Sequence, residues 1–375
     1  MTAQLALHTV PGLPRPRGEL SAAVIAALRR EPPPGPLPVE AAGRADPYGE
    51  DLTLALQVCY ELHYRGFRSV HPDWEWQPDL LRLRAALEHT FLAALRSDVD
   101  SGDDVAAALD PLLVEPIPGD GVSHRLRDNG TANQMREYFV HRSIYHLKEA
   151  DPHAWVIPRL SGQAKASLVA VEFDEFGAGR AERVHAQLFA DLLQAAGLHP
   201  GYLHYLDIVP APAIAAVNLM SLFGLHRGLR GALVGHFTAA EITTAPSAAR
   251  MAQALHRLGA AQPCVRFYTE HIEADAVHEQ VMRRDVLGDL LDREPELAAD
   301  VVFGVRATDL LEQRLADHLL SAWDAGETSL RQPLSRHGDQ LFLRPRDTRS
   351  TDVREREDTT HGLGFAVDGT GHSSR

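Results

Sequence analysis

The chain has 375 residues, of which 45% are hydrophobic, so it is long enough to bury a large core in one or two domains. Its formal net charge is −14, and this acidic balance disfavours a nucleic-acid groove or an anionic membrane surface as the main partner. Cys59 and Cys264 are the only cysteines and form no CxxC pair, which excludes a disulfide framework, a zinc knuckle and a thiolate-held iron–sulfur cluster. A metal site in this chain would therefore use oxygen and imidazole ligands.

The first 47 residues contain one helix-like stretch, GELSAAVIAALRR, followed by a segment rich in proline and glycine. Because prolines and glycines interrupt the helical hydrogen-bond ladder, residues 1–47 are predicted to form an extension and a linker. The N-terminus lacks the basic-then-apolar order of a secretory signal, and no apolar run reaches the roughly 18 to 20 residues of a membrane span. We therefore expect a cytoplasmic protein.

From residue 48 onward, apolar residues recur mainly at helical spacing, and long runs of strict alternation are scarce. This spacing predicts an all-α fold, with an N-terminal helical region over residues 48–130 and a main helical domain over residues 131–330. Residues 331–375 are polar, highly charged and poor in apolar side chains. Such a segment cannot offset the entropy lost on ordering, so it is predicted to be a disordered tail.

The segment FYTEHIEADAVHEQVM carries His271, Asp275 and His278 at helical spacing. Because each residue of a helix turns about 100°, these positions fall at about 0°, 40° and −20° around the axis, and the three side chains can reach one point. Two imidazoles and a carboxylate suit iron, manganese or zinc, and they commonly hold iron(II) with positions left open. The alternative is a solvated helix face, since further glutamates lie close by.

A second stretch, VEFDEFGAGRAERVHAQLFADLL, combines acids with a histidine. Its candidates are Glu172, Asp174, Glu175, Glu182 and His185. Glu182 precedes His185 by three residues, the spacing used in ferritin-like bundles. Glu175 is a rival on nearly the same face, although Gly177 and Gly179 could break the helix in between. Periodicity does not choose between the two glutamates, and an acidic helix N-terminus is the alternative for the whole stretch.

Two more glutamates lie in helical stretches. Glu241 sits among small and apolar residues, and a buried carboxylate must pair, become protonated or bind a cation. His236, five residues earlier, falls on a different face and is predicted to be a packing or surface residue. Glu149 is close to a helix end, where it is either a ligand or a surface side chain. If Glu149, Glu175, Glu241 and Asp275 were all ligands, their four charges would balance two iron(II) ions.

Taken together, these stretches resemble the haem-oxygenase-like diiron oxidases and oxygenases, a family also described as iron-containing redox enzymes. The resemblance covers about residues 135–292. It is carried by Tyr145-His146-Leu147-Lys148-Glu149-x-Asp151-Pro152-His153, by Asp174-Glu175-Phe176-Gly177 with His185 ten residues after Glu175, by Arg230-Gly231 before Glu241, and by Glu270-His271-x3-Asp275-x2-His278.

This resemblance implies a haem-oxygenase-like bundle of about seven core helices that binds two iron ions. The implied ligands are Glu175, His185, Glu241, His271, Asp275 and His278, with Glu149 as an extra carboxylate ligand of some members. It thereby favours Glu175 over Glu182. Glu175, Glu241 and Asp275 are the residues expected to act in catalysis.

The implied activity is the use of O2 to oxidise a small organic substrate, often in natural-product biosynthesis. The reactions of the family include amine N-oxygenation, C–C cleavage and oxidative decarboxylation of an amino or fatty acid. The expected partners are a small-molecule substrate, an external electron donor and a second copy of the chain in a homodimer, without nucleic acid or membrane. Arg227 and Arg230 are candidates for binding a substrate carboxylate, with surface salt bridges as the alternative.

Three other functions use the same residues differently. A non-catalytic iron-binding protein would need the same ligands. A cofactor-metabolising enzyme of the thiaminase-like branch would use a cysteine nucleophile, for which Cys264 is the candidate, but this cysteine lacks a local base pattern. A true haem oxygenase needs only one axial histidine and would leave three carboxylates without a purpose.

Overall fold

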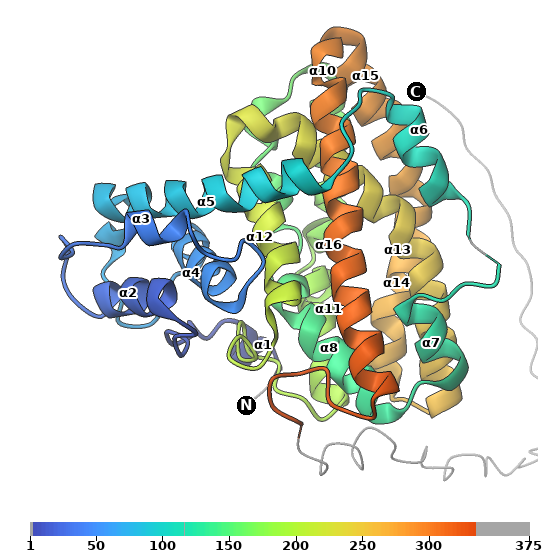
Figure 1. The fold of residues 1–375 in the computed structure, drawn as a ribbon. Coiled ribbons are helices and arrows are strands. Elements are labelled where there is room, and N and C mark those ends of the chain that lie inside the picture. The colour runs from blue at the N-terminus through green and yellow to red at the C-terminus, as the bar shows by residue number, and fades with distance from the viewer. Residues whose placement is uncertain (1–2, 116, 335–375) are drawn as a thin grey trace, which may run out of the picture. The chain divides into compact units, whose positions relative to one another are not determined.

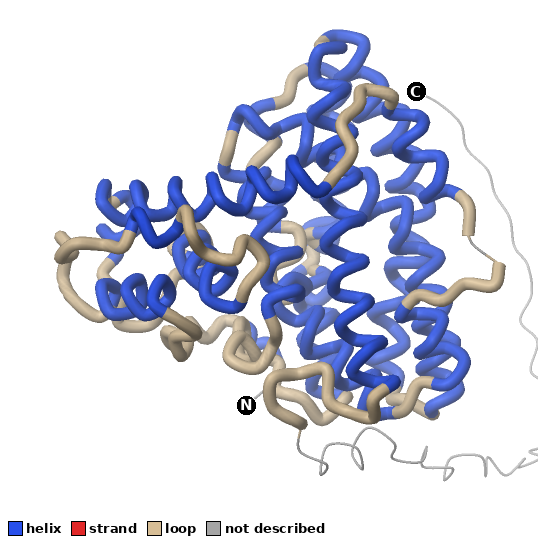
Figure 2. Tube along the Cα trace, viewed as in Figure 1, coloured by secondary structure: helices blue, strands red, loops and turns tan. Residues whose placement is uncertain are grey.

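The computed structural model describes residues 3–115 and 117–334, apart from the side chains at positions 4, 5, 273 and 275. These residues belong to one compact unit. Within them the ordered elements are helices, and no strand occurs (Figure 2), so the predicted all-α class is confirmed. No helix of this part of the chain is both long and apolar enough to cross a membrane. The tail predicted to be disordered lies outside the described residues from position 335 onward.

The main domain is a bundle of long helices (Figure 1). Helix α13 packs against α14 and α16, while α12 contacts α8, α13 and α16, and α11 contacts α8 and α14. The bundle helices are α8 (Ala132–His146), α10 (Gly162–Glu175), α11 (His185–Ala195), α12 (Ala211–Leu225), α13 (Arg230–Leu258), α14 (Gln262–Gln280) and α16 (Ala298–Asp324). Two shorter helices lie between bundle helices, α9 (Asp151–Ala154) and α15 (Gly288–Arg293), and two precede α8, namely α6 (Val105–Leu109) and α7 (Val122–Asn129).

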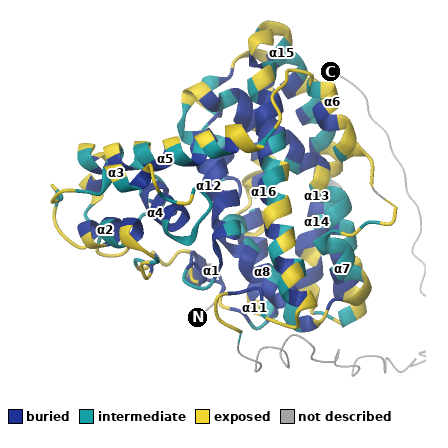
Figure 3. Ribbon diagram, in the orientation of Figure 1, coloured by how far each residue is buried: buried dark blue, intermediate teal, exposed yellow. Residues whose placement is uncertain are grey.

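Helix α12 is buried on nearly all of its faces (Figure 3). Its sequence, APAIAAVNLMSLFGL, is apolar around the whole helix, as expected for a helix enclosed by others. On one side it packs against the bundle, and on another it packs against α4 (Glu50–Glu61) of the N-terminal region. The core is therefore continuous from the N-terminal region into the bundle.

The N-terminal helices pack against the rest of the unit. Helix α1 (Ala3–Leu7) contacts α11, α2 (Glu19–Leu28) contacts α4, and α3 (Val39–Ala42) contacts α5 (Pro78–Asp98). The helix-like stretch GELSAAVIAALRR thus does form a helix, α2. The segment expected to be an extension and linker contributes buried side chains to the core, among them Leu20, Val24 and Leu28.

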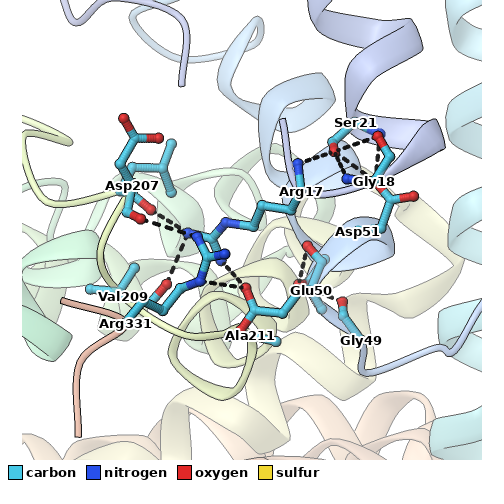
Figure 4. Close-up of polar contacts among 12 residues, drawn as sticks. Arg17, Gly18, Ser21, Gly49, Glu50, Asp51, Asp207, Val209, Ala211 and Arg331 are labelled. Atoms are coloured by element: carbon cyan, nitrogen blue, oxygen red, sulfur yellow. Dashed lines mark hydrogen bonds and ion pairs between the residues drawn. The ribbon is translucent and has the colours of Figure 1, made fainter. Parts of the chain in front are cut away.

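A network around Arg17 holds the N-terminal region against the start of α12 (Figure 4). The Arg17 guanidinium donates to Glu50 Oε2 at 2.5 Å and to the carbonyl oxygens of Leu206 at 2.5 Å and Val209 at 2.9 Å. The other oxygen of Glu50 accepts from the backbone N–H of Ala211 at 2.9 Å. The Arg17 side chain is almost fully buried, so its positive charge has lost contact with water. The carboxylate and carbonyl oxygens around it compensate for this loss.

Asp51 caps the N-terminus of α2 from a neighbouring helix. Its carboxylate accepts from the backbone N–H groups of Leu20 at 2.9 Å and Ser21 at 2.8 Å, and from the Ser21 hydroxyl at 2.6 Å (Figure 4). Asp51→Ala is therefore expected to lower the free energy of unfolding by about 1 to 2 kcal/mol, as the loss of a helix cap does. Urea unfolding measures this loss, and the exposed Asp73→Ala serves as control. Equal effects of the two substitutions would contradict the capping role.

A buried ion pair lies directly beside the segment that carries Glu149. Lys148 Nζ is 2.9 Å from Glu61 Oε2, and neither side chain is exposed. The Tyr202 hydroxyl also donates to Glu61 Oε2, at 2.8 Å. A buried charge without partners would be costly, so this network fixes the position of the chain around residue 148.

Candidate metal centre

Six of the predicted ligands meet inside the bundle as two groups of three. Within each group, one ligand atom of every residue lies within 4.8 Å of the others. All six side chains are buried, with exposures of 2 to 6%. The first group is Glu149, His185 and His271, and the second is Glu175, Glu241 and His278.

A tight turn brings Glu175 and His185 together. Helix α10 ends at Glu175, and Gly177 follows with φ at 74°, a left-handed conformation that favours glycine. A Cβ at Gly177 would also lie 2.6 Å from the backbone nitrogen of Val184, so the turn has no room for a side chain. Helix α11 then starts at His185, whose Nδ1 lies 2.7 Å from Glu175 Oε2. The rival Glu182 is exposed within the turn, on η5 (Ala181–Arg183).

The carboxylate of Glu175 links the two groups. Its Oε2 faces His185 of the first group, whereas its Oε1 lies 3.5 Å from Nδ1 of His278 in the second. The same His278 nitrogen is 3.4 Å from Glu241 Oε2. Glu175 therefore offers one oxygen to each ligand group.

The two histidines of α14 are oriented by hydrogen bonds on their far sides. Nδ1 of His271 donates to the carbonyl oxygen of Phe267 at 2.7 Å, and its Nε2 lies 3.9 Å from Glu149 Oε2. Nε2 of His278 is 3.3 Å from Asp174 Oδ2, while its Nδ1 faces the carboxylates. Metal-binding histidines are commonly held by a carbonyl or carboxylate on the second ring nitrogen, which fixes the tautomer. Each ring therefore turns its other nitrogen toward a carboxylate of its own group.

The carboxylates of the centre are buried close to one another, and a bound cation would stabilise their charged forms. Glu241 Oε2 is buried and accepts no hydrogen bond. Burial, together with the charge of Glu175, raises the pKa of Glu241 well above its ordinary value. Burial also acts to raise the pKa of Glu149, but His146, whose Nδ1 lies 2.9 Å from Glu149 Oε2, and His271 hold it below its ordinary value. Three buried carboxylates with three imidazoles fit divalent iron well.

Some predicted site residues lie elsewhere or are not described. The backbone of Asp275 is in α14 between the two histidines, but its side chain lies outside the described part of the structure, so its role as a ligand stays a prediction. Arg230 forms an ion pair with Glu294, and Arg227 is exposed on η6 (Arg227–Leu229). Neither arginine lines the cavity described below.

A cavity of about 400 Å³ adjoins the two groups, within the range of small-molecule sites. Its walls come mainly from α8, α13, α14 and α16, and Glu149, Glu175, Glu241 and His271 form part of them. Tyr145 also lines it, and burial together with the nearby carboxylates raises the pKa of this phenol well above its ordinary value. A small molecule in the cavity would therefore lie next to the candidate ligands.

Two further residues contribute to the site: His146, which was not a candidate from the sequence, and Asp174, which was one of the acids of the second stretch. His146 orients Glu149, and Asp174 orients His278. Both lie within the motifs that carry the family resemblance, one three residues before Glu149 and the other next to Glu175. Their proximity along the chain was a usable signal, but the direction of each side chain depends on the fold.

Glu172 is a buried acid one helical turn before Glu175. It is 2% exposed, and neither of its oxygens has a hydrogen-bond partner. Burial, and to a lesser degree the charges of Glu175 and Asp151, raise the pKa of Glu172 to about 9. At neutral pH this side chain is therefore protonated in the folded protein.

Glu172→Gln is expected to remove part of the pH dependence of stability. Because the pKa of Glu172 is higher in the folded than in the unfolded chain, its contribution to stability is present at low pH and is lost as the pH rises toward 9. Relative to the wild type, the metal-free variant should gain up to about 1.4 kcal/mol per pH unit over this interval. Urea unfolding of both proteins at pH 6 and pH 8 measures the difference. A difference that does not change with pH would contradict the assignment.

Cys264 has the properties of a core residue. It is fully buried near the start of α14, and burial raises the pKa of its thiol to about 12. A thiol with so high a pKa carries almost no thiolate at neutral pH. These properties argue against a cysteine nucleophile of the thiaminase-like kind.

The geometry agrees with comparison to known proteins. No curated protein matches the chain significantly. Residues 136–313 match the family model described as iron-containing redox enzyme, and this region contains the two ligand groups and the helices that carry them. With the all-helical structure of the described residues, the match confirms the expected haem-oxygenase-like fold. Over residues 136–313, the chain is therefore similar to the iron-containing redox enzyme family.

Proposed function

We propose that this protein is a non-haem diiron enzyme that uses O2 to oxidise a small organic substrate. The observation that carries the proposal is the position of Glu175, whose two oxygens face one nitrogen of each ligand group. A single-metal site would not need a carboxylate between two sets of ligands. Two iron(II) ions would also balance the charges of Glu149, Glu175, Glu241 and Asp275.

Each group has a definite part in this proposal. Glu149, His185 and His271 would hold one ion, Glu241 and His278 the other, and Glu175 would serve both. Asp275 is proposed as a further ligand from α14. When bound, the iron ions supply the redox chemistry with dioxygen. The chain keeps the histidines oriented through Phe267 and Asp174, and its cavity positions the substrate beside the carboxylates.

The reaction type is one of those expected from the resemblance: N-oxygenation of an amine, C–C cleavage or oxidative decarboxylation. The proposal includes an external electron donor and a cytoplasmic location. A non-catalytic iron-binding protein is the second candidate. The cavity favours the enzyme, because an iron store or carrier has no use for a substrate-sized space beside its ligands.

Oxygen consumption tests the proposal. Protein loaded anaerobically with two equivalents of iron(II) is mixed with oxygenated buffer and a reductant, and dissolved O2 is followed over time. We expect repeated turnover by the wild type and loss of turnover in Glu175→Ala. Glu182→Ala is the matched control, since this exposed glutamate lies in the same turn and should be dispensable. Turnover that survives Glu175→Ala, or a single oxidation without turnover in the wild type, would contradict the proposal.

A further inference from the structure

The cavity beside the metal centre contains a second pair of charged groups. Arg142 of α8 donates two parallel hydrogen bonds to Glu312 of α16, from Nη1 to Oε1 at 2.8 Å and from Nη2 to Oε2 at 2.6 Å. Both side chains line the cavity. They retain 25% and 37% of their surface exposed, so a ligand in the cavity can reach the charged groups.

Both members of this pair are ionised. Burial acts to raise the pKa of Glu312, but the Arg142 guanidinium holds it below its ordinary value. Burial acts to lower the pKa of Arg142, and Glu312 more than offsets this effect. The cavity wall thus carries one positive and one negative charge, joined by a bidentate contact. The guanidinium of Arg142 can bind a carboxylate of a ligand, and the carboxylate of Glu312 can bind a cationic group.

A neutral polar group lies in the same wall. His236 of α13 is 2% exposed, and its Nδ1 is 2.7 Å from Thr308 Oγ1 of α16. Its Nε2 has no hydrogen-bond partner, and both His236 and Thr308 line the cavity. Burial lowers the pKa of His236 to about 4, so the ring is neutral and retains one hydrogen-bonding position for a ligand.

This polar region lies a short distance along the helices from Glu241 and from His146, which contacts Glu149. Arg142 precedes His146 by four residues on α8, about 6 Å of helix rise. His236 precedes Glu241 by five residues on α13, about 7.5 Å of rise. A molecule held at the ion pair would therefore place its other end near the metal centre.

The charges distinguish between classes of ligand. The carboxylate of a fatty acid would compete with Glu312 for the one guanidinium of Arg142. Its alkyl chain would also remove water from the ion pair. A simple amine would compete with Arg142 for the one carboxylate of Glu312. A zwitterion supplies a partner for each member, so neither charge is left uncompensated.

We infer that Arg142 and Glu312 bind the head group of a small zwitterionic substrate of the amino-acid class, its carboxylate at Arg142 and its ammonium group at Glu312. The remainder of this substrate extends toward the carboxylates of the metal centre. The inference rests on the proposed function for its chemistry, but it concerns binding alone and can be measured separately.

Calorimetric binding of defined probes tests this inference. The probes are the twenty common L-amino acids, decanoate and hexylamine, each titrated into metal-free and iron(II)-loaded protein. The test variant is the double substitution Arg142→Met and Glu312→Met, because removing both charges avoids leaving one of them buried alone. The matched control is Arg314→Met with Asp98→Met, an ion pair of 3.4 Å that does not line the cavity.

At least one amino acid is expected to bind the wild type and the control, with binding to the test variant weaker by roughly ten- to a hundredfold. The inference is overturned if the test variant binds as well as the wild type, if decanoate or hexylamine binds and no amino acid does, or if no probe binds. Iron content is measured in the same samples. Absence of iron from the wild type would refute the proposed function, whereas the inference about the head group depends only on the binding results.

Discussion

Replacing His271 with alanine is expected to remove most iron binding and to reduce O2 turnover by more than about a hundredfold. Substitution of residues that merely orient a metal ligand typically costs 10- to 100-fold in affinity or activity, and loss of the ligand itself should cost more. His271 is 4% exposed, and a hydrogen bond to the Phe267 carbonyl fixes its ring. Alanine supplies neither the nitrogen nor the orientation. Metal analysis after anaerobic loading and an oxygen electrode measure the two effects.

The control for this experiment is His256→Ala, since His256 is an exposed histidine on α13, away from the ligand groups. It should leave iron content and turnover unchanged. Circular dichroism of both variants checks that the helices persist. If His271→Ala kept two irons per chain and its full rate, the first ligand group would be wrongly assigned.

Gly304→Ala is expected to lower the free energy of unfolding by about 3 kcal/mol or more. A Cβ at Gly304 would overlap the backbone of Ala232, and one at Gly235 would overlap the backbone of Val301. Neither neighbour can turn away as a flexible side chain could, so α13 and α16 would have to separate. These two helices carry Glu241 and much of the cavity wall, and the substitution should therefore weaken iron binding as well.

Gly288→Ala is the matched control. Gly288 begins α15 in a right-handed helical conformation, and a Cβ there would meet nothing within 4 Å. This substitution should raise stability by up to about 1 kcal/mol, because alanine loses less conformational entropy in a helix. Chemical denaturation compares the two variants. A Gly304→Ala protein as stable as Gly288→Ala would refute the close approach of α13 and α16.

The fold class followed from local patterns, because apolar residues at helical spacing predict helices wherever they occur. Even α2 could be expected from its sequence, although proline and glycine around it suggested only an extension. Its partner, α4, lies some 30 positions later in the chain, and no local pattern reports such a contact. The packing of residues 1–47 against the core was therefore beyond the reach of the sequence.

In the candidate site, too, local patterns could be predicted from the sequence, whereas contacts between distant segments could not. One helix carries His271 and His278, so the helical repeat alone indicated that both side chains face the same region, but the structure places them in different ligand groups and not at one point. The choice between Glu175 and Glu182 depended on the turn at Gly177, and only the resemblance to a family favoured Glu175 before the turn was seen. The pairing of Arg142 with Glu312 joins helices 170 residues apart in sequence, and neither residue belongs to a motif.

The iron content of the protein, together with its Mössbauer spectrum, tests the diiron centre most directly. Protein loaded anaerobically with excess iron(II) is freed of unbound metal, exposed briefly to O2 and frozen. We expect two irons per chain and, after oxidation, the signal of an exchange-coupled iron(III) pair. One iron per chain at saturation, with the spectrum of an isolated high-spin iron(III), would contradict this expectation.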